Sequence, residues 1–328
     1  MRTLIALLCC SVLAVGQNSN LGSSGAKFLS IPVGARAAAM GGAVIGTTDD
    51  ASAVFWNPAG IARLTGTALH FSSLDLYGQF GMSAASVVHN LGDIGTIAAS
   101  YTSLAMKKTE ITTELQPEGT GRYFDAQDIA IGLTYSRALS AEFSAGLTVK
   151  YVNQRIWNEV AEGVAFDFGT QYKVNFQNLV IAMSMSNFGG DIRFDGEDLN
   201  ITYLRNSDYP ISRLAPGRLQ TSDVPLPLIF QVGVAMDLER NELFSIRGEI
   251  DATHPNDANE RVNVGTEIGF LDRLYLRGGY RFNYDDEGLT LGGGFTAQIG
   301  ESIVRFDYAY AQFDLLPNLH RYSVGLEF

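Results

Sequence analysis

The stretch Arg273–Tyr284, RLYLRGGYRFNY, has a period of two residues. One set of alternate positions holds Leu274, Leu276, Gly278, Tyr280, Phe282 and Tyr284. The other set holds Arg273, Arg277 and Arg281. Successive side chains of a β-strand point to opposite faces of the sheet, so this pattern predicts a strand with one apolar face and one face that carries arginines. Its length suits a strand that crosses a bilayer at a tilt.

The same period recurs from about residue 66 to the end of the chain. Fourteen segments show it, and every second connection between them is short, as expected when both ends of a barrel lie on one side of a membrane. We therefore predict an all-β fold, a transmembrane antiparallel β-barrel of about 14 strands. The predicted strands are 67–77, 80–89, 94–111, 123–138, 141–157, 163–173, 178–188, 226–238, 242–252, 260–271, 273–284, 288–299, 302–313 and 319–328.

Composition supports a barrel in a membrane. The chain has 35 Gly, 14 Tyr and 19 Phe, and only 18% of its residues are charged, yet no long apolar segment follows residue 16. Alternation of lipid-facing and lumen-facing residues explains an average that is only half hydrophobic. The net charge of −12 argues against a nucleic-acid partner.

The beginning of the chain resembles a secretory leader. Arg2 precedes a short apolar run that ends at Gly16, which predicts a signal peptide over 1–16. Its removal takes away both cysteines, so we expect no disulfide and no thiol nucleophile. The predicted organisation is a signal peptide (1–16), an amino-terminal hatch in the lumen (17–65) and the barrel (66–328), placed in the outer membrane of a Gram-negative bacterium.

Two further parts of the barrel carry predictions. The last strand, LHRYSVGLEF, places Tyr322 and Phe328 on one face, which resembles the insertion signal of bacterial outer-membrane barrels. The long segment 189–225 is expected to be an extracellular loop, either a functional surface or a variable insertion.

The polar face of the strands is expected to line the lumen. Charged residues placed there could form a polar pathway or a salt-bridge ladder that fills the barrel, and the sequence leaves both open. They are Arg247, Glu249, Asp251, Glu267, Arg273, Arg277, Arg281, Arg305 and Asp307. The four histidines have no paired metal-ligand spacing, and no catalytic elbow or phosphate-binding loop occurs. We expect no enzyme activity, no metal and no cofactor.

Residues Gly34–Leu64, GARAAAMGGAVIGTTDDASAVFWNPAGIARL, depart from the two-residue period. A lumen enclosed by 14 strands leaks unless something fills it, and this segment is available. A helix-prone run from Arg36 to Met40 ends at Gly41–Gly42, and Asp49 or Asp50 can cap a second turn, 51–55. Asn57–Pro58 then breaks that turn.

At these residues the chain resembles a known family. KFLSIPVGARAAAMGGA followed by DDASAVFWNPAGIARL is similar to the amino-terminal signature of the PorV/PorQ family, grouped with UPF0164 proteins and related to FadL-type fatty-acid channels. The residues that carry the resemblance are Arg36, Met40, Gly41, Gly42, Asp49, Asp50, Asn57, Pro58 and Ala59. The resemblance implies a 14-stranded outer-membrane barrel with a hatch.

The resemblance also implies two functions. The main hypothesis is a non-enzymatic component of a type IX-like secretion system that binds a translocon or exported cargo proteins, with 189–225 as the cargo-facing surface. The alternative is a FadL-like transporter that passes long-chain fatty acids or other hydrophobic small molecules. Neither the cargo nor the ligand can be named from the sequence.

Overall fold

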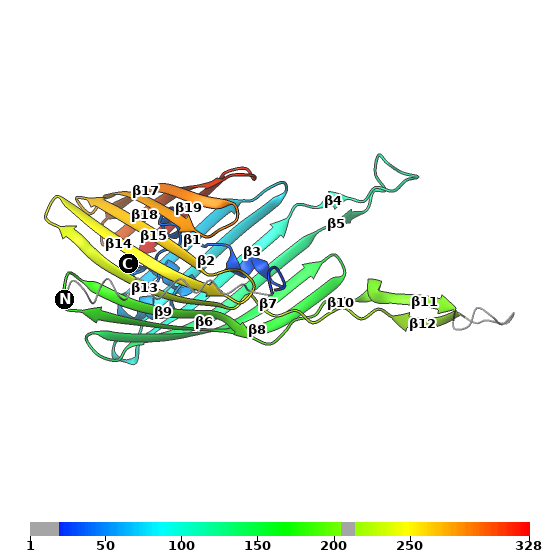
Figure 1. Cartoon of the computed structure of the whole chain (residues 1–328), viewed down its shortest axis with the longest axis horizontal. Helices are drawn as coiled ribbons and strands as arrows, with labels where there is room; N and C mark the ends of the chain where they lie inside the picture. Colours follow the sequence, from blue (N-terminus) through cyan, green and yellow to red (C-terminus); the bar gives the residue numbers. More distant parts are fainter. Residues whose placement is uncertain (1–19, 205–213) are drawn as a thin grey trace.

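The computed structural model describes residues 20–204 and 214–328. The signal peptide predicted over 1–16 lies outside the described residues. The chain forms a closed antiparallel barrel of 14 strands with a few short helices near the amino terminus, which confirms the predicted fold class. Figure 1 shows these first helices inside the ring of strands.

The barrel strands follow one another around the ring in chain order, and the ring closes because β1 pairs with β19. Every predicted strand is present, with ends that shift by a few residues. The barrel strands are β1 (Thr67–Asp75), β2 (Phe80–Asn90), β3 (Thr96–Met106), β6 (Ala126–Ala138), β7 (Phe143–Ile156), β8 (Glu159–Val174), β9 (Leu179–Gly189), β13 (Ile229–Arg240), β14 (Phe244–Pro255), β15 (Arg261–Phe270), β16 (Leu274–Phe282), β17 (Glu287–Ile299), β18 (Ser302–Phe313) and β19 (Leu319–Glu327).

The remaining elements lie in the hatch or in connections. The hatch contains η1 (Lys27–Ser30), α2 (Ala35–Ala39), η2 (Ala51–Phe55) and η3 (Pro58–Arg63). The connections contain η4 (Gly92–Ile94), β4 (Thr109–Glu110), β5 (Tyr123–Phe124), β10 (Asp195–Gly196), η5 (Glu197–Leu199), β11 (Asn200–Leu204) and β12 (Leu214–Arg218). No helix among the described residues is long and apolar enough to cross a bilayer.

The two ends of the barrel differ. One end, which we call the short-turn end, carries tight connections such as 300–301 between β17 and β18. The other, the long-loop end, carries the hairpins β4/β5 and β11/β12, which project well beyond the barrel (Figure 1). The segment predicted as one long loop over 189–225 therefore contains short strands and a 3₁₀ turn of its own.

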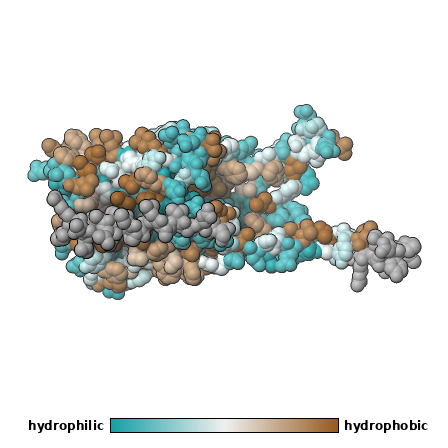
Figure 2. Space-filling view, in the orientation of Figure 1, coloured by the Kyte–Doolittle hydropathy of each residue, from teal (hydrophilic) through white to brown (hydrophobic). Residues whose placement is uncertain are grey.

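The outside of the barrel is apolar. Leu133 and Leu276 are 67% and 69% exposed. Exposed large apolar side chains stand at every second position, as at Ile131, Leu133 and Tyr135 of β6. Figure 2 shows hydrophobic residues spread over the visible side of the barrel. An apolar outer band with a polar interior is typical of a transmembrane barrel. Tyr322, Val324 and the terminal Phe328 are exposed on this outer side.

Candidate functional site: the hatch and the cavity above it

The hatch contacts strands around nearly the whole ring. Helix α2 packs against β16 to β19, η2 against β1 to β3, and η3 against β3 and β6 to β8. The remaining side is held by the loop Val44–Thr47, which hydrogen-bonds to β14. Because these contacts surround the hatch, the lumen is closed at this level.

Small side chains let the hatch approach the wall. The helix-prone run becomes α2, whose alanines are buried against Ala309 of β18. A Cβ at Gly279 of β16 would collide with the backbone of Met40 and Gly41, and a Cβ at Gly169 of β8 would collide with Asn57. Glycine is therefore required at both wall positions, because any side chain there would push the hatch away.

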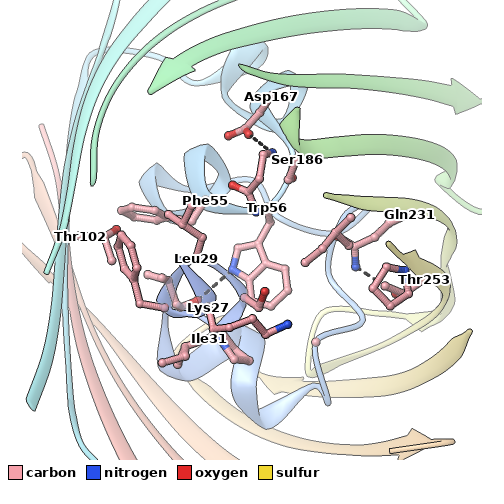
Figure 3. A pocket seen from close by; sticks show the side chains of 18 of the residues that line it. Lys27, Leu29, Ile31, Phe55, Trp56, Thr102, Asp167, Ser186, Gln231 and Thr253 are labelled. Carbon is pink, nitrogen blue, oxygen red and sulfur yellow. Dashed lines mark hydrogen bonds between the residues drawn. The ribbon is translucent and has the colours of Figure 1, made fainter. Parts of the chain in front are cut away.

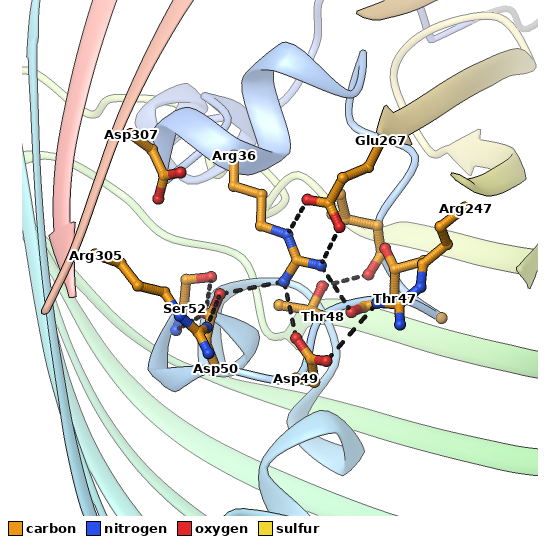
Figure 4. Close-up of polar contacts among 12 residues, drawn as sticks. Arg36, Thr47, Thr48, Asp49, Asp50, Ser52, Arg247, Glu267, Arg305 and Asp307 are labelled. Atoms are coloured by element: carbon orange, nitrogen blue, oxygen red, sulfur yellow. Dashed lines mark hydrogen bonds and ion pairs between the residues drawn. The ribbon is translucent and has the colours of Figure 1, made fainter. Parts of the chain in front are cut away.

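Arg36 is the centre of an ion-pair network between hatch and wall (Figure 4). Its Nε donates to Glu267 Oε2 of β15 at 3.0 Å, and its Nη2 donates to Glu267 Oε1 at 3.3 Å. Nη1 donates to Asp49 Oδ1 at 2.9 Å and to Asp50 Oδ2 at 3.3 Å. One guanidinium thus binds two parts of the hatch and one wall strand, in the bidentate geometry that arginine favours.

Wall arginines complete the network. Arg277 Nε lies 2.6 Å from Glu267 Oε2, and its Nη1 lies 2.6 Å from Asp307 Oδ1. Arg247 and Arg305 each lie 3.8 Å from a hatch carboxylate, Asp49 and Asp50 respectively. The charged lumen residues therefore form ion pairs with one another and with the hatch.

Two hatch groups respond to this environment. Burial favours the neutral form of Asp50, but Arg36, His70 and Arg305 together hold the pKa of its carboxyl well below the ordinary range. Burial alone would lower the pKa of Arg36, yet Glu267, Asp49 and Asp50 raise it well above the ordinary value. Both groups are therefore charged at any physiological pH, and the network is a permanent one.

A second connection joins the loop Val44–Thr47 to β14 through two buried carboxylates. Asp251 Oδ2 accepts from Val44 N at 2.9 Å and from Ile45 N at 3.3 Å. Glu249 Oε1 accepts from Gly46 N at 2.6 Å, and its Oε2 accepts from Thr47 N at 3.0 Å. Four successive backbone N–H groups of the hatch are satisfied by these two side chains.

Asn57 fixes the other side of the same loop. It is fully buried, and its Nδ2 donates to Ile45 O at 2.9 Å and to Thr170 O of β8 at 3.2 Å. Its Oδ1 accepts from Ala59 N at 3.1 Å, so Asn57 begins η3, with Pro58 at the first position of that turn. The Asn-Pro-Ala motif thus both ends η2 and joins the hatch to the wall.

We expect Asn57→Ala to raise solute permeability and to destabilise the hatch by about 1.5–4.5 kcal/mol, because three hydrogen bonds of about 0.5–1.5 kcal/mol each are lost. Leakage of small sugars from proteoliposomes measures the first effect. Asn90→Ala is the matched control, because Asn90 makes comparable side-chain hydrogen bonds in a turn at the short-turn end. Equal leakage through both variants would show that Asn57 does not hold the hatch.

The other predicted site residues are placed as follows. Asp50, not Asp49, caps η2, because its side chain accepts from Ser52 N. Arg281 is buried in the lumen and donates to Gly41 O at 3.1 Å. Arg273, expected on the lumen face, lies instead in the exposed turn between β15 and β16, where Leu271 and Asp272 adopt positive φ.

A cavity of about 160 Å³ lies on the long-loop side of the hatch (Figure 3). Hatch residues such as Leu29, Ile31, Phe55 and Trp56 form its apolar part. Trp56 is held in place because its Nε1 donates to Val33 O at 2.9 Å. Strand residues with polar side chains form the rest, among them Thr102, Lys150, Asp167, Gln231 and Thr253.

Two polar cavities, of about 350 and 210 Å³, lie on the short-turn side. They are lined by Arg36, Asp49, Arg247 and other charged groups of the network. No described residue lines both the cavity on the long-loop side and one of the two cavities on the short-turn side. The hatch therefore separates an amphipathic compartment from a charged one.

Sequence reasoning missed the cavity and the partners of Arg36. The cavity residues come from η1, η2 and many separate strands, and no local pattern shows which of them meet. The sequence does contain a signal for the two buried carboxylates. Glu249 and Asp251 are two residues apart and therefore lie on the same, lumen-facing side of a strand, where buried acidic side chains require hydrogen-bond donors.

The fold and the site define a barrel closed by an internal hatch. Solved structures share this fold. The CymD monoaromatic hydrocarbon channel has a TM-score of 0.59 at 13% identity, covering 91% of this chain and 98% of that one. The Ralstonia pickettii toluene transporter TbuX has a TM-score of 0.55 at 12% identity, with 89% and 96% covered.

A Pseudomonas aeruginosa FadL homologue is also similar, with a TM-score of 0.52 at 12% identity and coverage of 91% and 98%. At this identity the likeness shows the fold, a FadL-like barrel. No protein-family model matches the chain, and no curated protein matches it.

Proposed function

We propose that this protein is an outer-membrane channel that takes up small hydrophobic molecules, a non-enzymatic role. The observation that carries the proposal is the cavity of about 160 Å³, which the hatch closes from the short-turn side. A compartment inside a barrel that is partly apolar and carries a few polar groups suits a small hydrophobic ligand. Proteins with the same fold include a monoaromatic hydrocarbon channel and a toluene transporter.

The size of the cavity favours compact ligands. An engineered protein cavity of about 150 Å³ lined by apolar side chains binds benzene. A single ring with a small substituent therefore fits the space seen here, whereas a long alkyl chain would extend out of it. Among the ligand classes expected from the sequence, hydrophobic molecules smaller than long-chain fatty acids are supported best.

The secretion hypothesis has no support in the comparisons, and the uptake alternative fits them better. Its one structural candidate, the 189–225 segment, projects from the rim as the β11/β12 hairpin (Figure 1). Nothing in the described part of that segment indicates a cargo protein.

Thr102→Phe tests uptake. Thr102 faces the cavity from β3 and makes no side-chain hydrogen bond to the described residues, so a phenyl ring can occupy the ligand's space without breaking a polar contact. We expect uptake of radiolabelled toluene into cells to fall about tenfold. Ala99→Phe, on the outer face of the same strand, is the control and should leave uptake unchanged.

The proposal is wrong if cells with and without the protein take up toluene and larger aromatic hydrocarbons at the same rate. Heat-dependent gel mobility of each variant shows whether its barrel has folded, so that a failure to fold is not mistaken for a blocked cavity.

A further inference from the structure

Arg321 has no partner in the described part of the chain. It lies on β19 and is 5% exposed, and its guanidinium makes no hydrogen bond or ion pair with any described residue. It faces the lumen, because Ser323, two residues further on, accepts from Ala35 N of the hatch at 2.6 Å. A buried charge without a partner is costly, so its presence requires an explanation.

Two more arginines accompany it at the long-loop end of the lumen. Arg281 of β16 is buried and forms an ion pair with Glu287. Arg261 of β15 has no carboxylate partner among the described residues. Its guanidinium carbon lies 4.2 Å from the ring centre of Tyr284, and its Nε is buried without an acceptor. Of these three guanidinium groups, only that of Arg281 forms an ion pair with a described carboxylate.

Two further carboxylates line the cavity, and both are paired. Asp257 Oδ2 is 2.6 Å from Lys27 Nζ, and Asp167 Oδ1 is 2.8 Å from Lys150 Nζ, so each already has a cationic partner. Among the described charged residues that line the cavity, Arg261 is therefore the cation that has no carboxylate partner.

This positive region and the apolar region belong to one cavity. Arg261 and Arg281 line it together with Phe55 and Trp56. Arg321 does not line it, but it is a further buried cation of the same lumen. In a buried place of low dielectric, such cations attract an anion more strongly than they would in water.

We propose that the cavity selects compact aromatic anions, molecules with a single ring and a carboxylate, over neutral hydrocarbons. The ring would pack against Trp56 and Phe55, and the carboxylate would accept from Arg261, whose Nε has no other acceptor. Arg281 and Arg321 would strengthen the site electrostatically. This inference rests on the proposed function, and it adds the charge of the cargo.

Benzoate and benzamide test the inference, because they differ chiefly in charge. The chain has two tryptophans. In Trp157→Phe protein Trp56 is the sole reporter, and its fluorescence follows binding in detergent. We expect benzoate to bind at least about tenfold more tightly than benzamide, since a hydrogen bond to a charged group is worth that much or more.

Two variants distinguish direct contact with the ligand from the electrostatic effect of a more distant charge. Arg261→Met should lower benzoate affinity about tenfold and leave benzamide affinity unchanged, whereas Arg321→Met should lower benzoate affinity by a smaller factor, about threefold. Neither change leaves a carboxylate without its cation, so both variants should fold. Arg240→Met is the control of equal charge change, since Arg240 is exposed at the short-turn end.

The outcomes distinguish the two proposals. If toluene and benzamide bind as tightly as benzoate, the anion selectivity is wrong and the channel for hydrophobic molecules stands. If none of toluene, benzoate and benzamide changes the fluorescence of Trp56, both proposals fail. An equal loss of benzoate affinity in Arg240→Met would also contradict the assignment to Arg261 and Arg321.

Discussion

Replacing Arg36 by methionine will release the hatch while the barrel stays closed. The substitution leaves Glu267 and Asp50 with fewer partners in a buried place, because Arg36 binds both. Removing one member of a buried ion pair costs about 3–5 kcal/mol, and we expect the lower value here because Arg277 still binds Glu267. This cost falls on the hatch, since the strand ladder of the barrel does not involve Arg36.

Conductance in planar bilayers and leakage from proteoliposomes measure the effect. We expect Arg36→Met to raise both well above the wild-type values, with unchanged heat-dependent gel mobility of the barrel. Arg36→Lys should be intermediate, because an ammonium keeps the charge but cannot bind Glu267 through two parallel hydrogen bonds. Wild-type conductance in Arg36→Met protein would show that other contacts suffice to hold the hatch.

The strands were predictable because the barrel follows one local rule. Outward and inward residues alternate on each strand, so a period such as that of Leu274, Leu276 and Tyr280 states the fold directly. Errors occurred where a turn interrupts the rule. Arg273 continues the alternation on paper, but Leu271 and Asp272 take positive φ and place it in an exposed turn.

The sequence indicates which segment forms the hatch, but it does not indicate the hydrogen bonds and ion pairs that hold the hatch in the barrel. Helix-prone and capping residues identify α2 and η2, since these are local effects. The partners of Arg36, by contrast, lie 13, 14 and 231 positions away in the sequence. The sequence predicts only capping roles for Asp49 and Asp50. In the structure both carboxylates also accept hydrogen bonds from Arg36.

The arginines of the Arg273–Tyr284 stretch also have partners that the sequence pattern does not predict. Arg273, Arg277 and Arg281 share one set of alternate positions, yet their surroundings differ completely. Arg273 is exposed in a turn, Arg277 binds Glu267 and Asp307, and Arg281 binds Glu287 beside the cavity. Whether a lumen charge is neutralised depends on neighbouring strands, so charge balance has to be taken from the structure.

Glu249→Gln will loosen the hatch, and Asp251→Asn will not. Both substitutions replace a carboxyl group by an amide, at two lumen positions of β14 that are two residues apart. Glu249 uses both carboxylate oxygens, one for Gly46 N and one for Thr47 N, so an amide must turn its NH₂ toward one of these donors. Asp251 accepts both of its backbone hydrogen bonds through Oδ2 alone, and its Oδ1 accepts no hydrogen bond from the described residues, so an asparagine can keep both.

We expect Glu249→Gln to destabilise the hatch by about 1–3 kcal/mol, the cost of a buried hydrogen-bond donor that loses its acceptor. Solute leakage and proteolysis of the hatch should both increase in that variant, and Asp251→Asn should resemble the wild type. Equal leakage in the two variants would mean that the charge of the pair matters rather than its hydrogen-bond geometry. A difference between them would instead assign the hold on Val44–Thr47 to the two oxygens of Glu249, because the chemical change, the strand and the burial are matched.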